Sequence, residues 1–242
     1  MAIAQAALQS DSLQRVLPAG FPTRNPRPAQ RETTEAVVAM PGIAGPLQRL
    51  GQTIAYDRNE VVEDAGDPAE FVYKVVSGTL RAVRLLADGR RHIARFLTAG
   101  DYFGIAEADE YSSGLEAITD CTLMRYPRRS FEGILESDAT AGRQLFGQIC
   151  RQLEASNHLL LLLGRKTATE RLASFLLSFR QNDAEAICLP MCRSDIADHL
   201  GLTIETVSRV ITKFRQQRWI RLQDASHIVI TAPDALKALA AN

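Results

Sequence analysis

The chain has 242 residues, of which 46% are hydrophobic, so it is long enough to bury the core of one large domain or two modest ones. Its 28 basic and 28 acidic residues cancel, which excludes a molecule that is basic all over, and any surface for nucleic acid must be local. The longest apolar run, Leu159 to Leu163, is far shorter than the roughly 20 residues that span a bilayer, and no signal-peptide pattern opens the chain, so we expect a cytoplasmic protein with no membrane partner.

The first segment, residues 1–40, is rich in Ala, Gln, Pro and Arg and shows no sustained strand or helix period. Such a composition predicts a flexible N-terminal tail. A docking arm for a partner is the alternative role for the same residues.

Residues 41–136 are expected to form an antiparallel β-roll, because short β-type segments alternate there with Asp-Gly, Gly-Asp and Ser-Gly turns. The pair Asp88-Gly89 predicts a hairpin with a type I′ turn, since both central residues of that turn need a positive φ that this dipeptide tolerates. The predicted strands are Thr53 to Tyr56, Glu60 to Glu63, Phe71 to Val76, Thr79 to Leu86, His92 to Phe96 and Glu116 to Tyr126.

Residues 137–164 carry a helical period that ends at Gly164. A helix of about 25 residues is about 40 Å long, which is more than one small roll can cover. We therefore expect its apolar seam to pack partly on the same helix of a second copy and to form a two-fold homodimer, with an intramolecular core helix as the alternative. The seam residues are Leu145, Ile149, Leu153, Ser156, Leu160 and Leu163.

Residues 165–242 are expected to form a winged helix-turn-helix DNA-binding domain, because two short helical patterns meet at a turn on Gly201 and two strand patterns follow. Trp219 would lie in the core of the wing. The other predicted elements are a helix from Thr169 to Arg180, a loop from Gln181 to Ala186, and wing strands from Trp219 to Leu222 and from His227 to Thr231.

The second helix of the motif is expected to read DNA. Thr203 can cap its N-terminus by accepting a backbone N–H. Glu205, Ser208 and Arg209 are spaced i, i+3 and i+4 and so share one face. The residues expected to pack inward are Val207, Val210, Ile211 and Phe214.

The residue types on the reading face suit base pairs in a major groove. Arg can donate two hydrogen bonds to guanine, a carboxylate can accept from the cytosine amino group, and Ser can do either. A solvated amphipathic helix with ordinary Glu-to-Arg pairs is the alternative, which the preceding DIADHLG turn disfavours. Local positive charge comes from Arg209, Lys213, Arg215, Arg218 and Arg221. Contacts to the DNA backbone are expected from Thr203, Thr206, Thr212, Lys213 and Arg193.

The run DIADHLGLTIETVSR resembles the DNA-binding signature of the CRP/FNR superfamily of bacterial transcription regulators, and PMCRSDIADHLGLTIETVSR is most similar to its FixK-type branch. The segments YKVVSGTLR and AGDYFG resemble the family's cyclic-nucleotide-binding-like roll, and residues 137–164 resemble its dimerisation helix. The resemblance implies an α+β homodimer on palindromic double-stranded DNA, with reading helices about 34 Å apart. It also implies an activator that recruits RNA polymerase to genes of low-oxygen respiration, denitrification or nitrogen fixation.

The resemblance narrows the half-site as well. Members similar to the cyclic-AMP receptor carry Arg before the Glu, whereas this chain has Ile204, as FNR-type and FixK-type readers have an apolar residue. A TTGAT half-site, paired with ATCAA, is implied, with Ile204 near a thymine methyl and Glu205, Ser208 and Arg209 on the inner bases.

The family's nucleotide effector fits this sequence poorly. Ser112 and Ser113 stand where members that bind cyclic AMP have Arg-Ser, and the acidic residues Glu107, Asp109 and Glu110 would repel a phosphate. Cyclic-nucleotide control is the alternative that these residues disfavour.

We expect no cofactor and no metal. No cysteine precedes Cys121, which excludes the N-terminal cysteine set that holds the iron–sulfur cluster of FNR. Haem bound by His92 or His158 remains the other alternative. An enzyme is not expected, because no Ser/His/Asp set, zinc spacing or phosphate-binding loop occurs.

The four cysteines form no CxxC pair and are expected to be reduced. Cys121, Cys150 and Cys188 lie among apolar residues and are expected to pack in the interior. Cys192 precedes the first helix of the motif, where a helix N-terminus and Arg193 favour the thiolate. Its oxidation would place charge close to DNA phosphate, which predicts a redox brake, and a small packing residue is the alternative.

Overall fold

A computed structural model describes residues 31–32, 46–105, 109–180, 186–224 and 226–241. Nearly all of the predicted N-terminal tail lies outside these ranges. Two of its residues, Arg31–Glu32, form strand β1 and pair antiparallel with β2 (Gln52–Tyr56). These two residues belong to a sheet rather than to a tail, because the edge of β2 offers unpaired backbone groups to an extended segment.

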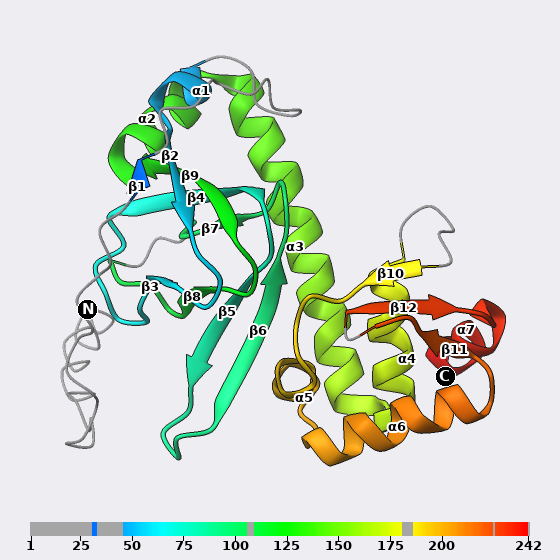
Figure 1. The fold of residues 1–242 in the computed structure, drawn as a ribbon. Helices are drawn as coiled ribbons and strands as arrows, with labels where there is room; N and C mark the ends of the chain where they lie inside the picture. The colour runs from blue at the N-terminus through cyan, green and yellow to red at the C-terminus, as the bar shows by residue number, and fades with distance from the viewer. Residues whose placement is uncertain (1–30, 33–45, 106–108, 181–185, 225, 242) are drawn as a thin grey trace, which may run out of the picture.

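Two antiparallel sheets form the β-roll that the sequence predicts (Figure 1), with strand orders β1-β2-β9-β4-β7 and β3-β8-β5-β6. Side chains of both sheets, among them Ile54, Leu80, Leu115 and Leu123, meet in a buried core. The remaining strands of the roll are β3 (Val61–Glu63), β4 (Phe71–Ser77), β5 (Leu80–Leu85), β6 (Arg91–Leu97), β7 (Tyr102–Phe103), β8 (Gly114–Ala117) and β9 (Cys121–Pro127).

The segment predicted as one strand from Glu116 to Tyr126 is two strands in different sheets, β8 and β9. Residues 118–120 turn the chain between them, and the Thr119 hydroxyl accepts the backbone N–H of Thr79 at 3.0 Å. The prediction was wrong because the apolar alternation runs on through a turn that has neither Gly nor Pro.

The hairpin between β5 and β6 lies at Asp88-Gly89, as predicted, but its turn type differs. Among the described residues other than glycine, only Asn59 and Arg218 have a positive φ, so Asp88 has a negative one. The Gly89 N–H donates to the Leu86 carbonyl at 2.9 Å, and Gly89 itself has a φ of 82°. An ordinary β-turn closed by one left-handed glycine therefore replaces the predicted type I′ turn.

Three helices cover the outer face of the five-stranded sheet: α1 (Pro46–Leu50), α2 (Arg128–Ser137) and α3 (Ala139–Arg165). Leu47, Tyr126 and Phe131 are buried between these helices and the sheet. The sequence did not predict α2, and it placed the start of the long helix at Ser137.

The long helix starts two residues later because Asp138 caps it. The carboxylate of Asp138 accepts the backbone N–H groups of Thr140 and Ala141, at 2.8 and 3.2 Å. The helix also passes through Gly164 and ends at Arg165, one residue beyond the predicted end. Among the described residues, no helix combines the length and the apolar character that crossing a bilayer requires.

Some residues of the predicted α3 seam are buried in the chain's own core, and others are exposed to solvent. Leu145 is only 9% exposed and packs in the core under the roll, so it contributes to intramolecular packing rather than to a dimer seam. Ser156 is exposed and its hydroxyl donates to the Gln152 carbonyl, while Leu163 is half-buried. The exposed apolar side chains of this helix are Phe146 (69%), Ile149 (41%), Leu153 (60%), Leu160 (68%) and Leu161 (64%).

The C-terminal domain is the predicted winged helix-turn-helix, with two additional elements, β10 and α7. Ala186, predicted in a loop, starts β10, and residues 181–185 of that loop lie outside the described residues. Trp219 is half-buried and packs on Phe214 at 5.6 Å between ring centres, at the edge of the core rather than inside it. The elements are α4 (Ala168–Ser178), β10 (Ala186–Cys188), α5 (Arg193–Leu200), α6 (Ile204–Gln216), β11 (Ile220–Leu222), β12 (His227–Ile230) and α7 (Pro233–Ala241).

A single side chain, Arg171 of α4, joins the long helix to the motif. Its guanidinium donates to the carbonyls of Leu163 and Lys166 at the end of α3, and to the carbonyl of Leu200 at the end of α5, each at 2.9 Å. Carbonyls at the C-terminal end of a helix have no hydrogen-bond partner within that helix, and they form the negative end of the helix dipole. A cation that donates to them is favourable for both reasons. The reader is thereby fixed to the end of α3.

Candidate nucleic-acid interface

The turn between α5 and α6 depends on Gly201, as predicted. Gly201 has φ 61° and ψ 42°, a left-handed conformation that glycine adopts without strain. The Leu202 N–H donates to the Ala197 carbonyl at 3.0 Å and completes the turn. This geometry directs α6 across α5, as a helix-turn-helix motif requires.

Thr203 caps α6, also as predicted. Its hydroxyl accepts the backbone N–H of Thr206 at 3.2 Å. All four residues predicted to face inward are buried, and Val207 and Phe214 are fully enclosed. The inner face anchors α6 in the domain core and leaves the opposite face to solvent (Figure 1).

The four predicted base-reading residues lie on the outer side of α6. Ile204 is 46% exposed, Glu205 and Arg209 are exposed, and Ser208 is half-buried. A hydrogen bond from its own backbone N–H, and a second with the Thr203 side chain, lower the pKa of Glu205, so this carboxylate is ionised at neutral pH. The helix thus presents an anion and a cation to a ligand with both donors and acceptors on its surface.

The predicted backbone-contacting residues surround this face. Arg193 of α5 reaches across the turn and donates to the Ser208 hydroxyl at 3.2 Å. The Thr212 hydroxyl donates to the Ser208 carbonyl, and the Thr206 hydroxyl lies 3.1 Å from that of Thr203. Thr212, about one turn beyond Ser208, and the adjacent Lys213 are exposed.

Basic residues that the site prediction did not include lie where α6 meets the wing. A surface hollow of about 630 Å³ lies between the end of α6 and the wing, and Thr212 and Thr231 are at its rim. The Thr231 hydroxyl donates to the carbonyl of Arg218, which has a positive φ of 58°. The arginines that line this hollow are Arg215, Arg218 and Arg221. The sequence showed their charge but not that they converge.

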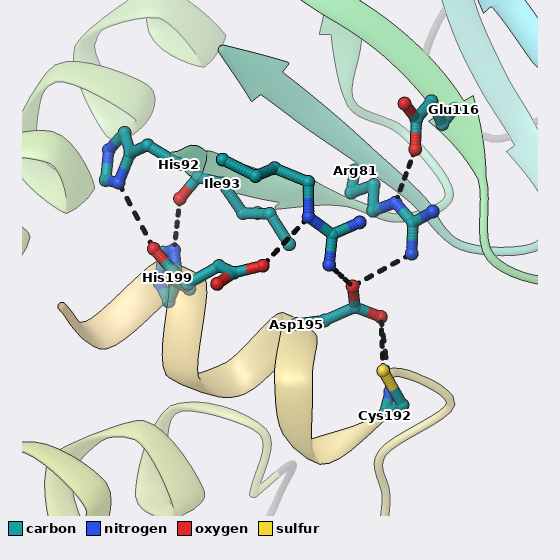
Figure 2. A network of polar contacts seen from close by, with 9 residues as sticks. Arg81, His92, Ile93, Glu116, Cys192, Asp195 and His199 are labelled. Atoms are coloured by element: carbon teal, nitrogen blue, oxygen red, sulfur yellow. Dashed lines mark hydrogen bonds and ion pairs between the residues drawn. The ribbon is translucent and has the colours of Figure 1, made fainter. Parts of the chain in front are cut away.

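Cys192 is the N-cap residue of α5, and it is exposed (Figure 2). Its thiol and its backbone N–H both donate to the Asp195 carboxylate, at 3.2 and 3.3 Å. The structure therefore places the thiol at the start of the motif, next to a carboxylate that was not part of the prediction.

The other three cysteines do not share one environment. Cys121 is buried, as predicted, and burial raises the pKa of its thiol. Cys150 and Cys188 are exposed, so the prediction that they pack inside is wrong. Cys150 lies on the uncovered side of α3, and Cys188 points outward from β10, an edge strand.

Helix α5 packs against the roll through charged side chains (Figure 2). Asp195 accepts hydrogen bonds from Arg81 of β5 at 2.9 Å and from Arg91 of β6 at 2.7 Å. Arg91 also pairs with Asp198 at 2.8 Å, and Arg81 with Glu116 at 2.7 Å. The contacts between α5 and the roll were absent from the sequence analysis, since those partners are more than a hundred residues apart.

Tyr111, which directly precedes the two serines that the resemblance implicates, belongs to the buried core of the roll. The Tyr111 ring stacks on Phe103 at 5.4 Å, and its hydroxyl donates to the Phe71 carbonyl at 2.8 Å. Ser113 is 8% exposed and Ser112 is exposed. Asp109 and Glu110 are exposed, whereas Glu107 lies outside the described residues.

The two histidines considered as haem ligands lie on different elements. His92 of β6 has its Nδ1 3.2 Å from the Asp198 carbonyl, and His158 is exposed on α3. Within the described ranges, no group of three or more His, Cys, Asp or Glu side chains is arranged to hold a metal ion.

Comparison with known proteins gives two domain families. Residues 170–239 match the Crp-like helix-turn-helix domain, and residues 53–138 match the cyclic nucleotide-binding domain. The nitrogen fixation regulation protein FixK of Rhizobium meliloti is 38% identical over 81% of this chain and 91% of its own length. FixK of Azorhizobium caulinodans is 37% identical over 89% of this chain and 91% of its own.

A solved structure of the same family is also similar. FixK2 from Bradyrhizobium japonicum matches with a TM-score of 0.73 and 38% identity, covering 78% of this chain and 96% of that one.

The contact of His199 with the roll predicts a pH dependence. Burial, the main cause, together with nearby His92 lowers the pKa of His199 below its usual value, although the hydrogen bond to the Ile93 carbonyl opposes this. The imidazole of His199 thus takes up a proton at lower pH in the folded protein than in the unfolded chain. The folding stability that this difference contributes is fully present above about pH 6.5 and is lost as the pH falls through the folded pKa. Between about pH 7.5 and 5.5, wild type should lose up to about 1.4 kcal/mol of stability that His199→Gln retains, as urea unfolding would measure. Equal losses in both proteins would contradict this assignment.

Proposed function

This chain belongs to the CRP/FNR superfamily of transcription regulators, in its FixK branch, and from that premise we propose that it binds as a homodimer to a palindrome of TTGAT-type half-sites. The family consists of DNA-binding regulators and not of enzymes. The observation that carries the proposal is the surface of α6, where Ile204, Glu205 and Arg209 stand exposed on a helix whose opposite face is fully buried.

The half-site follows from the chemistry of these side chains. Arg209 can donate to the guanine of TTGAT, Glu205 can accept from a cytosine amino group, and an exposed Ile204 offers an apolar contact to a thymine methyl. Ser208 would accept or donate beside them. The flanking phosphates would be held by Thr203, Thr206, Thr212, Lys213 and Arg193, which lie on α5, on α6 and at the start of α6.

The exposed stripe on α3 supports the dimer. Phe146, Ile149, Leu153 and Leu160 recur at helical spacing, and each is more than 40% exposed in one copy of the chain. A two-fold contact along this stripe buries the same side chains of both copies. Two readers would then meet successive major grooves about 34 Å apart.

The regulated genes and the mode of action are proposed from the relatives. Two relatives are named nitrogen fixation regulation proteins, and FnrL of Cereibacter sphaeroides is named a transcriptional activator. We assign to this chain the same class of role, activation of low-oxygen or nitrogen-metabolism genes through contact with RNA polymerase in the cytoplasm.

Cys192 would make DNA binding sensitive to oxidants. When the thiol loses its proton, the sulfur takes one oxygen from peroxide and becomes a sulfenic acid, and the hydroxide that leaves combines with that proton as water. At Cys192 that group would replace the hydrogen bond to Asp195 and add bulk at the start of the motif, beside the proposed phosphate contact of Arg193.

Arg209→Ala tests the reading assignment. We expect a loss of about 1–3 kcal/mol on the TTGAT palindrome and relaxed discrimination at its guanine, because a bidentate contact to one base is removed. Titration by fluorescence anisotropy on the palindrome and on a guanine-substituted duplex measures both. Lys213→Ala is the control, and it should weaken both duplexes equally. If Arg209→Ala weakened binding to both duplexes equally, the base-reading role of Arg209 would be contradicted.

Leu153→Glu tests the dimer. A buried carboxylate on each side of the two-fold contact should shift the protein to monomers at micromolar concentration, because two like charges would lie uncompensated in an apolar interface. Sedimentation equilibrium measures the mass. Glu154→Arg alters the charge at the adjacent exposed position and should leave the mass unchanged. A dimeric Leu153→Glu protein would place the contact elsewhere.

Cys192→Ser tests the brake. Peroxide should reduce palindrome binding by the wild type several-fold and leave the variant unaffected, since a serine hydroxyl caps the helix without this oxidation chemistry. Gel shifts before and after peroxide, with Cys188→Ser as the matched exposed control, decide the matter. Equal inhibition of wild type and Cys192→Ser would reject the proposal.

A further inference from the structure

Five charged side chains of alternating sign connect the roll to the first helix of the motif. In order they are Glu116, Arg81, Asp195, Arg91 and Asp198, which we call the ion-pair row. The four-stranded sheet supplies Glu116 and both arginines, and α5 supplies both aspartates. Each side chain in the row is paired with one or two side chains of opposite charge.

The centre of the row is removed from water. The Asp195 side chain is 2% exposed, Arg81 is 15% and Arg91 is 29% exposed. A carboxylate buried to this degree is tolerated only when it is paired and hydrogen-bonded. Since a planar guanidinium donates in fixed directions, two of them on one carboxylate define how α5 is turned as well as where it lies.

Strand β6 holds the second half of α5. The Nδ1 of His199 lies 2.9 Å from the Ile93 carbonyl, and its ring lies 5.1 Å from that of Phe96. His92 approaches the Asp198 carbonyl from the same strand. The roll therefore contacts α5 from its first turn to its last.

This contact leaves the reading face free. Glu205 and Arg209 stay exposed, and Ile204 is 46% exposed, although α5 is packed on the roll. The packed arrangement is thus compatible with DNA binding and does not mask the reader.

We propose that Arg81 and Arg91 are positioning residues for DNA reading. Through the ion-pair row they hold each reading helix at a fixed angle to its roll. Because the two readers are already oriented, binding to both half-sites does not cost the entropy of ordering them. The inference rests on the proposed binding of a palindrome by a dimer, and it assigns to the roll a role in how the reader is aimed.

Arg91→Ala, Asp198→Ala and their double variant test the proposal in the full-length protein. Asp195 is left intact because its carboxylate also accepts the Cys192 N–H at the start of α5. Arg90→Ala is the matched control, since Arg90 is 76% exposed and pairs with Asp88 inside the hairpin. The probes are the TTGAT palindrome, a duplex with one half-site, and a palindrome widened by two base pairs.

We expect Arg91→Ala and Asp198→Ala each to bind the palindrome roughly ten-fold more weakly, with less than about a two-fold change on the single half-site, because only simultaneous engagement depends on aim. The double variant should be no weaker than Arg91→Ala, since one pair cannot be lost twice. Preference for the correct spacing over the widened one should shrink in all three. Arg90→Ala should behave as wild type.

Unchanged palindrome binding in these variants would overturn the proposal, as would equal loss on the single half-site, which would indicate damage to the reader itself. Tighter palindrome binding would also overturn it, because the row would then hold the reader in an orientation unsuited to DNA. Failure of the wild type to prefer the palindrome over unrelated DNA would instead reject the proposed function, so the two failures are distinguishable.

Discussion

The structure depends on one carboxylate that is nearly excluded from water. Asp195 caps the first turn of α5, and it also receives one guanidinium from each of two strands of the roll. Moving such charges out of water costs nearly as much as their attraction returns, so pairs of this kind contribute less to stability than to a defined geometry. That balance suits a contact between domains, because it specifies one arrangement without making separation prohibitive.

The roll has an aromatic core and a charged outer surface. Tyr111 and Phe103 stack in its core, whereas Arg81 and Arg91 contact α5 of the reader. In this chain the four-stranded sheet therefore contributes a supporting surface. The domain that matches the cyclic nucleotide-binding family is thus joined directly to the first helix of the helix-turn-helix motif.

The reader could be predicted from sequence because every signal for it is local. Thr203 caps a helix that begins one residue later, Gly201 permits the left-handed turn, and the apolar period of α6 selects its buried face. The same reasoning failed for α3, because a helical period is identical whether the partner surface is the roll or a second copy. Leu145 and Leu153 look alike in sequence, yet one is 9% and the other 60% exposed.

The ion-pair row could not be predicted for a related reason. Arg81, Arg91 and Asp198 are residue types that usually lie exposed to solvent. Only the tertiary fold brings β5 and β6 against α5. Cys150 and Cys188 show the converse error, since apolar neighbours along the chain do not imply burial on the solvent side of a helix or on an edge strand.

The two attachments of the reader differ in what they demand of their partners. Arg171 binds three backbone carbonyls, so any residue at positions 163, 166 and 200 presents the same acceptors. The contact between α5 and the roll requires particular side chains on both surfaces. A C-terminal domain exchanged between relatives would therefore keep its connection to the long helix automatically. It would recover its angle to the roll only if strands β5 and β6 were transferred with it, so these strands and α5 form the smallest unit that can be exchanged without loss of alignment.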